Sequence, residues 1–321
     1  MTTRAPFARG SISLGLHPAA GDPTAAVEIL LDQAIRAENS GFDGVTLAEH
    51  HAGHPGYLPT PLLGASWILG ATESIWAAAA PMLLPIRPAG LVVEEATWLS
   101  ARHPGRVAVG FAPGYVEDDF RVAAASFEDR RKNFWPALRS VTRTLSTGEA
   151  SSPLDQDPAV ARCAEAPIPV VAAVSGPVGV RRAAQAGAGI LLGAFASIAD
   201  TRALIDAYAE AGGSGPRVLI RRIWIGEPPA GAVEQMIATY SRHGDSSSFL
   251  GDKGSSSVIF SPHTDEVVER LCAAAIQVGA DALNLRLVMP GVGESATTDQ
   301  IELAGREVVA PVRAALLATT G

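Results

Sequence analysis

The sequence predicts a (β/α)8 barrel of the α/β class, the TIM-barrel fold, on three observations. Short apolar runs alternate with amphipathic helical patterns along all 321 residues. Most of these runs are continuously apolar, which is typical of parallel strands covered by helices. After the first run the sequence reads HPAA, without the glycine-rich fingerprint that a dinucleotide-binding, doubly wound sheet carries there. The closed barrel is therefore favoured over the open sheet.

Eight runs have the length and composition of strands. They are residues 12–16, 44–47, 75–83, 107–111, 169–174, 188–192, 218–225 and 282–287. The first helix begins at Asp22 and Pro23, a cap and first-turn pair, and ends at Gly41. Further helices are predicted over 92–101, 127–145, 177–185, 198–211, 264–278 and 295–317. This alternation fits one barrel domain over residues 1–321.

Two polar stretches interrupt the alternation. Residues 146–168 are rich in Ser, Pro and Asp and are expected to form a surface connection. Residues 241–257 carry seven serines and three glycines, and form a long polar insertion near the C-terminal face of the barrel. Such an insertion is either a lid over the site or a loop without function.

The composition narrows the class of protein. A net charge of -8, with scattered basic residues, disfavours a nucleic-acid surface. Cys163 and Cys272 have no metal-ligand spacing and make no disulfide framework, as expected in a reducing compartment. The N-terminus lacks the apolar core of a signal peptide, and one glutamate and two prolines interrupt the apolar stretch 62–86. We therefore expect a cytoplasmic protein that does not span a membrane.

Several histidines follow the predicted strands, where the catalytic residues of a barrel lie. His17 follows the first strand, and Glu49, His50, His51 and His54 follow the second. Histidine titrates near neutral pH and can donate a proton, accept one or bind a metal ion. Four of the seven histidines at one rim therefore predict a site rather than four separate structural roles.

A metal site is the alternative interpretation of these histidines. His50, His51 and His54 resemble a zinc cluster, and a metal-dependent barrel hydrolase would follow from it. However, neighbouring residues of an extended segment point to opposite sides, so His50 and His51 do not easily share one ion. We therefore expect no metal.

Residues 169–182 read as a strand, a turn of small residues and a helix start. Backbone N–H groups at such a helix start suit a phosphate, and the Ser175 hydroxyl can add a hydrogen bond. An ordinary turn with proline at the first helical position gives the same pattern. The common phosphate site of barrels follows strands seven and eight instead, where the segment IGEPPAG carries the unfavourable acid Glu227.

Five segments in this order resemble the bacterial luciferase family of flavin-dependent monooxygenases, and the resemblance runs nearly end to end. They are GFDGVTLAEHH, LLGASWILGATESIWAAAAPMLLPIRP, HPGRVAVGFAPGYVEDDFRV, GADALNLRLVMPG and QIELAGREVVAPVR. The resemblance implies FMN, delivered in reduced form by a separate flavin reductase. Oxygen then forms a flavin hydroperoxide that oxidises a small organic substrate. A homodimer is also implied.

The resemblance also implies roles for particular residues. His50 or His51 would be the acid–base residue, and Glu49 would support the flavin ring. Candidate contacts to the ring face, with a cis bond before the proline, are Ala80, Pro81 and Met82. Further cofactor-binding candidates are Gly114 and Tyr115 in the loop after strand four, and Ser175, Gly176, Gly179 and Val180 for the phosphate. Apart from the resemblance, position at a strand end or aromatic character makes His17, Phe111 and Trp224 the candidates for substrate contact.

The sequence departs from the luciferase pattern after strand four. Where luciferases carry a reactive cysteine and then a phosphate-binding arginine, this chain has Ala112 and Pro113. Neither light emission nor a catalytic thiol is therefore expected. The role of the arginine would fall to Arg181, Arg182 or Arg87.

Two other functions remain open on the same barrel. A deazaflavin coenzyme would make the chain a hydride-transferring oxidoreductase, although its acidic tail calls for clustered basic residues that the sequence does not show. A flavin-binding homologue without activity is the second, and the presence of His50 and His51 disfavours it. The sequence predicts neither the substrate nor the atom that is oxidised.

Overall fold

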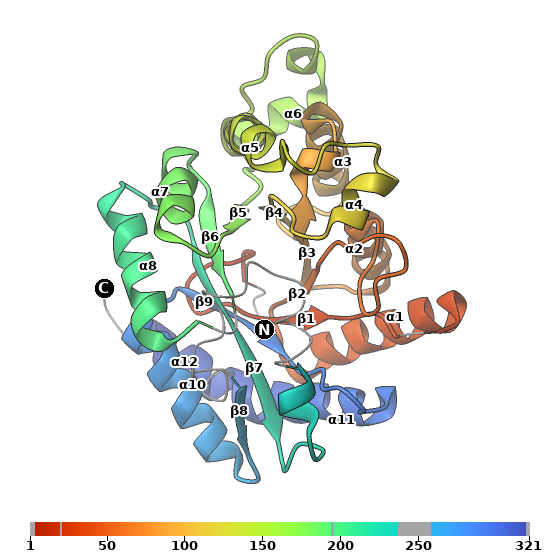
Figure 1. Ribbon diagram of the computed structural model, residues 1–321, viewed down its shortest axis with the longest axis vertical. Helices are drawn as coiled ribbons and strands as arrows, with labels where there is room; N and C mark the ends of the chain where they lie inside the picture. Colours follow the sequence, from red (N-terminus) through yellow and green to blue (C-terminus); the bar gives the residue numbers. More distant parts are fainter. Residues whose placement is uncertain (1–3, 20, 194–195, 237–257, 319–321) are drawn as a thin grey trace.

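The computed structural model describes residues 4–19, 21–193, 196–236 and 258–318 and contains a closed barrel of eight parallel strands (Figure 1). The barrel strands are β1 Ile12–Leu16, β2 Gly44–Leu47, β3 Trp76–Leu83, β4 Val107–Ala112, β5 Val170–Ala173, β6 Gly189–Leu192, β7 Arg217–Ile225 and β9 Ala282–Arg286. Strand β7 pairs with both β6 and β9, and β9 pairs with β1, which closes the barrel. The predicted fold class and its eight strands are confirmed.

A ninth strand, β8 Val258–Ser261, was not predicted. It pairs with Arg222–Ile225 at the C-terminal end of β7, where only Arg222 also pairs with β9. A four-residue strand that directly follows a serine-rich segment has too little pattern to be recognised. The predicted polar insertion over 241–257 lies outside the described residues.

Helices surround the barrel (Figure 1). They are α1 Pro23–Ser40, α2 Pro61–Ala71, α3 Ala89–Arg102, α4 Glu117–Val122, α5 Arg130–Thr147, α6 Pro158–Ala161, α7 Pro177–Gln185, α8 Ile198–Glu210, α10 Thr264–Val278, α11 Glu294–Ala304 and α12 Ala310–Ala318. The Asp22 side chain caps α1 by accepting from the Ala25 N–H, and Gly41 ends it with a φ of 110°. Helices α7 and α10 have the predicted bounds.

The structure differs from the prediction in three segments. No bounds were predicted for α2, because its residues are apolar on nearly every side and show no helical periodicity. The connection 146–168 contains α6 and two short 3-10 turns. The helix expected over 295–317 is divided by a π-helical segment, Gly305–Val309. A Cβ on Gly305 would lie 2.1 Å from Ser40 Oγ, so α1 packs closely against this segment.

The barrel interior changes character from its lower, N-terminal end to its upper, C-terminal end. The lower end is filled by Trp76 and by Phe7, whose rings lie 5.0 Å apart edge to face. A Cβ on Gly44 would lie 2.0 Å from the Trp76 ring, so this glycine makes room for the indole. Higher up, Asn284 donates hydrogen bonds to the hydroxyls of Ser13 and Thr46. The interior therefore becomes polar toward the end where the strands finish.

Among the described residues, no helix combines the length and the apolar character that crossing a bilayer requires.

Candidate active site

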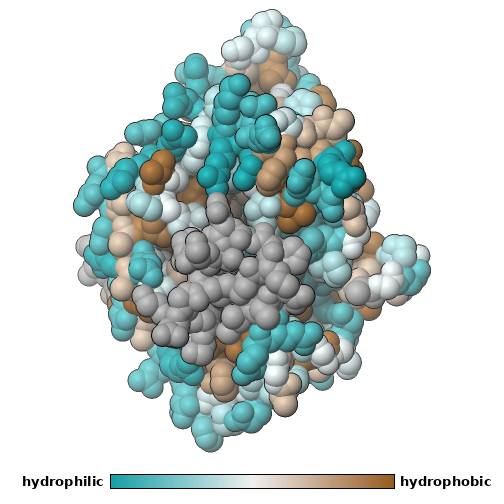
Figure 2. All heavy atoms as spheres, viewed as in Figure 1, coloured by the Kyte–Doolittle hydropathy of each residue, from teal (hydrophilic) through white to brown (hydrophobic). Residues whose placement is uncertain are grey.

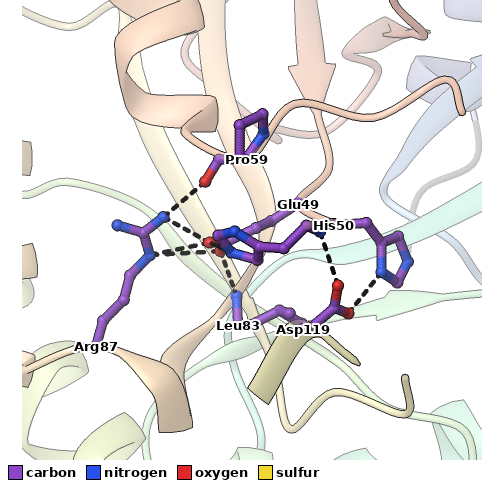
Figure 3. A network of polar contacts seen from close by, with 7 residues as sticks. Glu49, His50, Pro59, Leu83, Arg87 and Asp119 are labelled. Atoms are coloured by element: carbon purple, nitrogen blue, oxygen red, sulfur yellow. Dashed lines mark hydrogen bonds and ion pairs between the residues drawn. The ribbon is translucent and has the colours of Figure 1, made fainter. Parts of the chain in front are cut away.

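The chain leaving β2 carries a buried carboxylate that is held by several donors. Glu49 Oε2 accepts from the Leu83 N–H at 2.7 Å, and its Oε1 accepts from Arg87 Nε at 3.1 Å and from His51 Nε2 at 2.8 Å. Arg87 also donates to the Pro59 carbonyl at 3.0 Å. Figure 3 shows Glu49 between the Arg87 guanidinium and the Leu83 backbone. Glu49 thus joins the end of β2 to the end of β3.

His50 points away from Glu49 and meets Asp119 of α4. Its Nδ1 lies 2.7 Å from Asp119 Oδ2, and the other oxygen, Oδ1, accepts from the His51 N–H at 2.7 Å. Burial raises the pKa of Asp119, but the hydrogen bonds from His50 and His51 and the charges of both rings outweigh burial and hold this pKa below its ordinary value. An ionised carboxylate only accepts, so His50 Nδ1 carries a proton.

The second nitrogen of His50 is directed to aromatic residues. His50 Nε2 lies 3.2 Å from the hydroxyl of Tyr115, a residue that is 45% exposed. The His54 ring stacks on His50 with centroids 4.4 Å apart, and Tyr57 meets His50 edge to face at 4.6 Å. His50 is therefore fixed on one side by a carboxylate and faces an aromatic cluster on the other.

His17 joins the same cluster from the end of β1. Its ring lies 5.5 Å from that of Tyr57, edge to face. His17 Nδ1 donates to the Gly56 carbonyl at 3.1 Å, and Nε2 accepts from Arg286 Nη1 at 2.8 Å. Burial and the charges of Arg286 and Arg222 hold the pKa of His17 well below its ordinary value, although the bond to Gly56 opposes them. His17 is therefore a neutral, fixed imidazole.

The end of β3 has an irregular backbone, as the sequence suggested. The Ala80–Pro81 peptide bond is cis, which confirms that expectation. The register between β3 and β4 shifts between Ala79 and Met82, and the Glu49 N–H donates to the Pro81 carbonyl at 3.0 Å. The Ala80 side chain is buried in the barrel interior, whereas that of Met82 packs in the core outside the strands. Ala80 and Pro81 thus lie next to the histidine segment.

The loop after β4 contributes Tyr115 but not Phe111. Gly114 adopts a φ of +80°, and a Cβ there would lie 2.7 Å from the Phe120 ring, so glycine is required. Phe111 is fully buried in the core between strands and helices, so it is not brought to the histidine cluster. Trp224 is not in the histidine cluster either; it lies in a small apolar cluster at the end of β7 with Met289 and Val258.

The predicted phosphate segment forms the start of α7. Gly176 is the residue before the helix and caps it without a side-chain hydrogen bond. The Val180 N–H donates to the Gly176 carbonyl at 3.1 Å, and the Val180 side chain is buried in the core. A Cβ on Gly179 would lie 3.1 Å from Val174. Ser175 is exposed, Gly176 and Gly179 are half-buried, and Val180 is buried, so Ser175 is the most accessible member of this predicted set.

The arginines considered for the phosphate are engaged or directed elsewhere. Arg87 is paired with Glu49, and Arg181 is exposed on α7. Arg182 lies over the Trp135 ring at 5.5 Å and lines a groove of about 710 Å³ between α5 and α7. Figure 2 shows hydrophilic side chains gathered over α5. This groove is on the outside of the barrel, so none of these side chains is placed beside Ser175 by a contact in the structure.

Sequence reasoning assigned no role to four residues of the site. They are Tyr57, Asp119, Arg222 and Arg286. Asp119 lies in the segment YVEDDF and had no pattern to single it out among its acidic neighbours. The arginines had a signal, because alternate residues of an apolar strand face the same side, and a charge within such a strand is rare.

Within the residues that the structure describes, no group of three or more His, Cys, Asp or Glu side chains is placed to hold a metal ion. His50 and His51 have different partners, Asp119 and Glu49 respectively.

A comparison with known families decides which family this barrel represents. The profile of the family described as luciferase-like monooxygenase matches residues 8–306. The chain belongs to the luciferase-like monooxygenase family. The family match covers all the residues of the site above, from His17 to Arg286.

Curated relatives match part of this chain. The chain is 28% identical over 145 residues to the alkanal monooxygenase alpha chain of a Kryptophanaron alfredi symbiont. The aligned region covers 44% of this chain and 40% of that relative. The chain thus spans less than half the length of this relative.

The solved structures with this fold include a protein in complex with FMN and an F420-dependent enzyme. One is the oxygenating constituent of 3,6-diketocamphane monooxygenase from Pseudomonas putida, in complex with FMN, with a TM-score of 0.73 and 14% identity over 93% of this chain and 98% of that one. Another is an F420-dependent secondary alcohol dehydrogenase, with a TM-score of 0.72 and 18% identity over 97% of this chain and 99% of that one. At these identities the likeness shows the fold alone.

In this luciferase-like chain, small residues occupy the inward positions of β3 and β4, the strands that follow β2 around the barrel. They are Ala78, Ala80, Ala108, Gly110 and Ala112. A Cβ on Gly110 would lie 2.7 Å from that of Ala80, so the two strands leave no room for a larger side chain there. Of these residues only Ala112 is partly exposed, as is the neighbouring Pro81, so a flat ring system such as that of a flavin or a deazaflavin would meet the upper ends of the two strands.

Proposed function

We propose that the chain is a flavin-dependent monooxygenase that uses reduced FMN and molecular oxygen to oxidise a small organic substrate. One observation carries the proposal: in a luciferase-like chain, the buried His50 is held by Asp119 and directs Nε2 to the upper end of the barrel. FMN, when bound, supplies the electrons that activate oxygen. The protein supplies a proton-transferring group, a ring-binding wall and exclusion of water.

His50 is the acid–base residue in this proposal. Asp119 accepts from Nδ1 and thereby leaves Nε2 as the nitrogen that exchanges a proton with reactants. The ionised Asp119 also stabilises the imidazolium that forms when Nε2 takes up a proton. A carboxylate that orients a histidine in this way is a common arrangement in catalysis.

His51 has a supporting role rather than an equal one. Its Nε2 is engaged with Glu49, and its backbone N–H helps to hold Asp119. Because Glu49 is itself held by Arg87 and the Leu83 N–H, this cluster fixes the backbone on which His50 sits. Removing His51 should therefore change the site less than removing His50.

The cofactor lies against the small residues of β3 and β4 in this proposal. Ala80 and Pro81 form the wall, with Tyr115 and Gly114 at its edge, and Ser175 and Gly176 hold the phosphate near the first turn of α7. A separate flavin reductase delivers the reduced cofactor, and the chain forms a homodimer. The chain and the flavin reductase would meet in the cytoplasm.

The test is a spectroscopic titration with FMN and, separately, with the deazaflavin F420, each in the oxidised and reduced states. The proposal expects FMN to bind, with reduced FMN bound more tightly, and reoxidation by oxygen to be altered by the protein. A hydride-transferring enzyme would bind F420 and leave FMN free. Binding of neither cofactor would contradict both proposals.

A further inference from the structure

Two arginines lie inside the upper barrel on neighbouring strands. Val218 of β7 and Ala282 of β9 face the barrel interior, so alternation places Arg222 and Arg286 on that face. The two arginines are partners in the register of these parallel strands. They are only 5% and 6% exposed, which is rare for a charged side chain.

The surrounding chain is built to accept these guanidiniums. Gly15 of β1 faces Arg286, and a Cβ there would lie 2.3 Å from Arg286 Nε. Arg286 Nε donates to Asn284 Oδ1 at 2.9 Å, and Arg222 Nη1 donates to the Val288 carbonyl at 3.5 Å. Arg286 is thereby oriented by Asn284 and His17, so its position is specified by the sequence rather than accidental.

The arginine pair adjoins the proposed active site. Arg286 contacts His17, His17 meets Tyr57, and Tyr57 meets His50. Two residues beyond Arg222 on the same face, Trp224 packs with Met289 in an apolar cluster. A ligand here would thus meet two positive charges and an apolar surface.

We propose that Arg222 and Arg286 bind the acidic group of the substrate, which is therefore an organic anion with an apolar body. Two guanidiniums on adjacent strands match the oxygens of a carboxylate or sulfonate, which accept several charged hydrogen bonds at once. The inference rests on the proposed function, because it assigns a substrate class to that site.

The experiment measures ligand binding by calorimetry and by the shift in melting temperature, at constant ionic strength. The probes are benzoate, hexanoate and hexanesulfonate, with benzamide and hexanamide as neutral counterparts. The wild-type protein should bind at least one of the acids. The amide of a carboxylate that binds should have an affinity about tenfold or more lower than that carboxylate, since a charged hydrogen bond is lost. Equal binding of acids and amides, or no binding of any acid, would overturn the proposal.

Variants locate the binding. Arg222→Gln and Arg286→Gln should each weaken acid binding by roughly ten- to hundredfold, whereas Arg222→Lys, which keeps the charge, should weaken it less. Arg202→Gln removes the same charge from the exposed surface of α8 and should leave acid binding unchanged. Unchanged acid binding in the two barrel variants, both folded by circular dichroism, would overturn the assignment.

FMN binding is measured on the same proteins. The inference expects Arg222→Gln and Arg286→Gln to keep their affinity for FMN. An equal loss of FMN and acid binding would show that the pair serves the cofactor and would overturn the substrate assignment. If the wild-type protein binds acids but not FMN, the proposed monooxygenase function fails while the anion site stands.

Discussion

The two ends of the barrel handle charge in different ways. At the lower end, two carboxylates are paired with arginines: Asp281 accepts two hydrogen bonds from the Arg217 guanidinium, and Asp43 pairs with Arg313 and Arg4. At the upper end, Glu49 is also paired with Arg87, but Asp119 orients His50, and Arg222 and Arg286 face the barrel interior. The lower end therefore has the features of a structural base, and the upper end those of a site that meets a ligand.

The largest effect on stability is expected from removing the large side chain that fills the lower end of the barrel. Trp76→Ala should lower the free energy of unfolding by about 3–5 kcal/mol, because the indole is fully buried against Phe7 and leaves a cavity. Urea unfolding followed by circular dichroism measures it. Trp76→Phe, which keeps most of the ring volume, is the control and should cost clearly less. Equal costs would show that packing is not what Trp76 contributes.

At the upper end, His50→Gln should lower kcat for substrate oxidation by roughly a hundredfold or more, since general acid–base catalysis contributes at that scale. The free energy of unfolding and the affinity for FMN should change little. His51→Gln is the matched control one residue away, and its kcat should fall much less. If the two variants lose the same activity, His50 does not hold the role assigned to it here.

A lower-end ion pair should affect stability but not ligands. Asp281→Asn should cost about 1–2 kcal/mol in unfolding free energy, because it weakens two charged hydrogen bonds from Arg217. Acid and FMN binding, measured by titration, should stay at wild-type values. A marked loss of ligand binding in this folded variant would mean that the two ends are not independent.

The smallest effect concerns the pH dependence of stability. The pKa of His17 is held well below its ordinary value, so the unfolded chain takes up a proton near pH 6.5 that the folded chain does not. The free energy of unfolding should therefore decrease as the pH falls from about 7 to 5. Asp119 changes the free energy of unfolding only in a more acidic range, below the pKa of its unfolded state. His17→Gln should flatten the slope, and an unchanged slope would contradict the assignment.

The sequence predicted the barrel well because its signals are local. Continuous apolar runs, the Asp22 cap and Gly41 are properties of a few adjacent residues, and the structure shows the strands and helix ends that they predict. Strand β8 was missed because four residues carry little pattern, and α2 because an apolar helix has no polar face.

The site was predicted in part, for a physical reason. Strand ends meet at one rim of a barrel, so His17 and His50 could be grouped from the sequence, and the structure links them through Tyr57. Asp119 comes from a different element, and only three-dimensional packing pairs it with His50. Phe111 was assigned to the substrate from its position, but alternation along β4 turns it to the outer core.

The most direct test of the proposed function is the incorporation of isotopic oxygen. The protein is mixed with reduced FMN, ¹⁸O₂ and a panel of ketones, aldehydes and organic acids with apolar bodies, and the products are analysed by mass spectrometry. The account predicts one ¹⁸O atom in the oxidised product of at least one substrate, and its loss with His50→Gln. Product formation without ¹⁸O, or without any oxygen present, would contradict it and indicate hydride transfer.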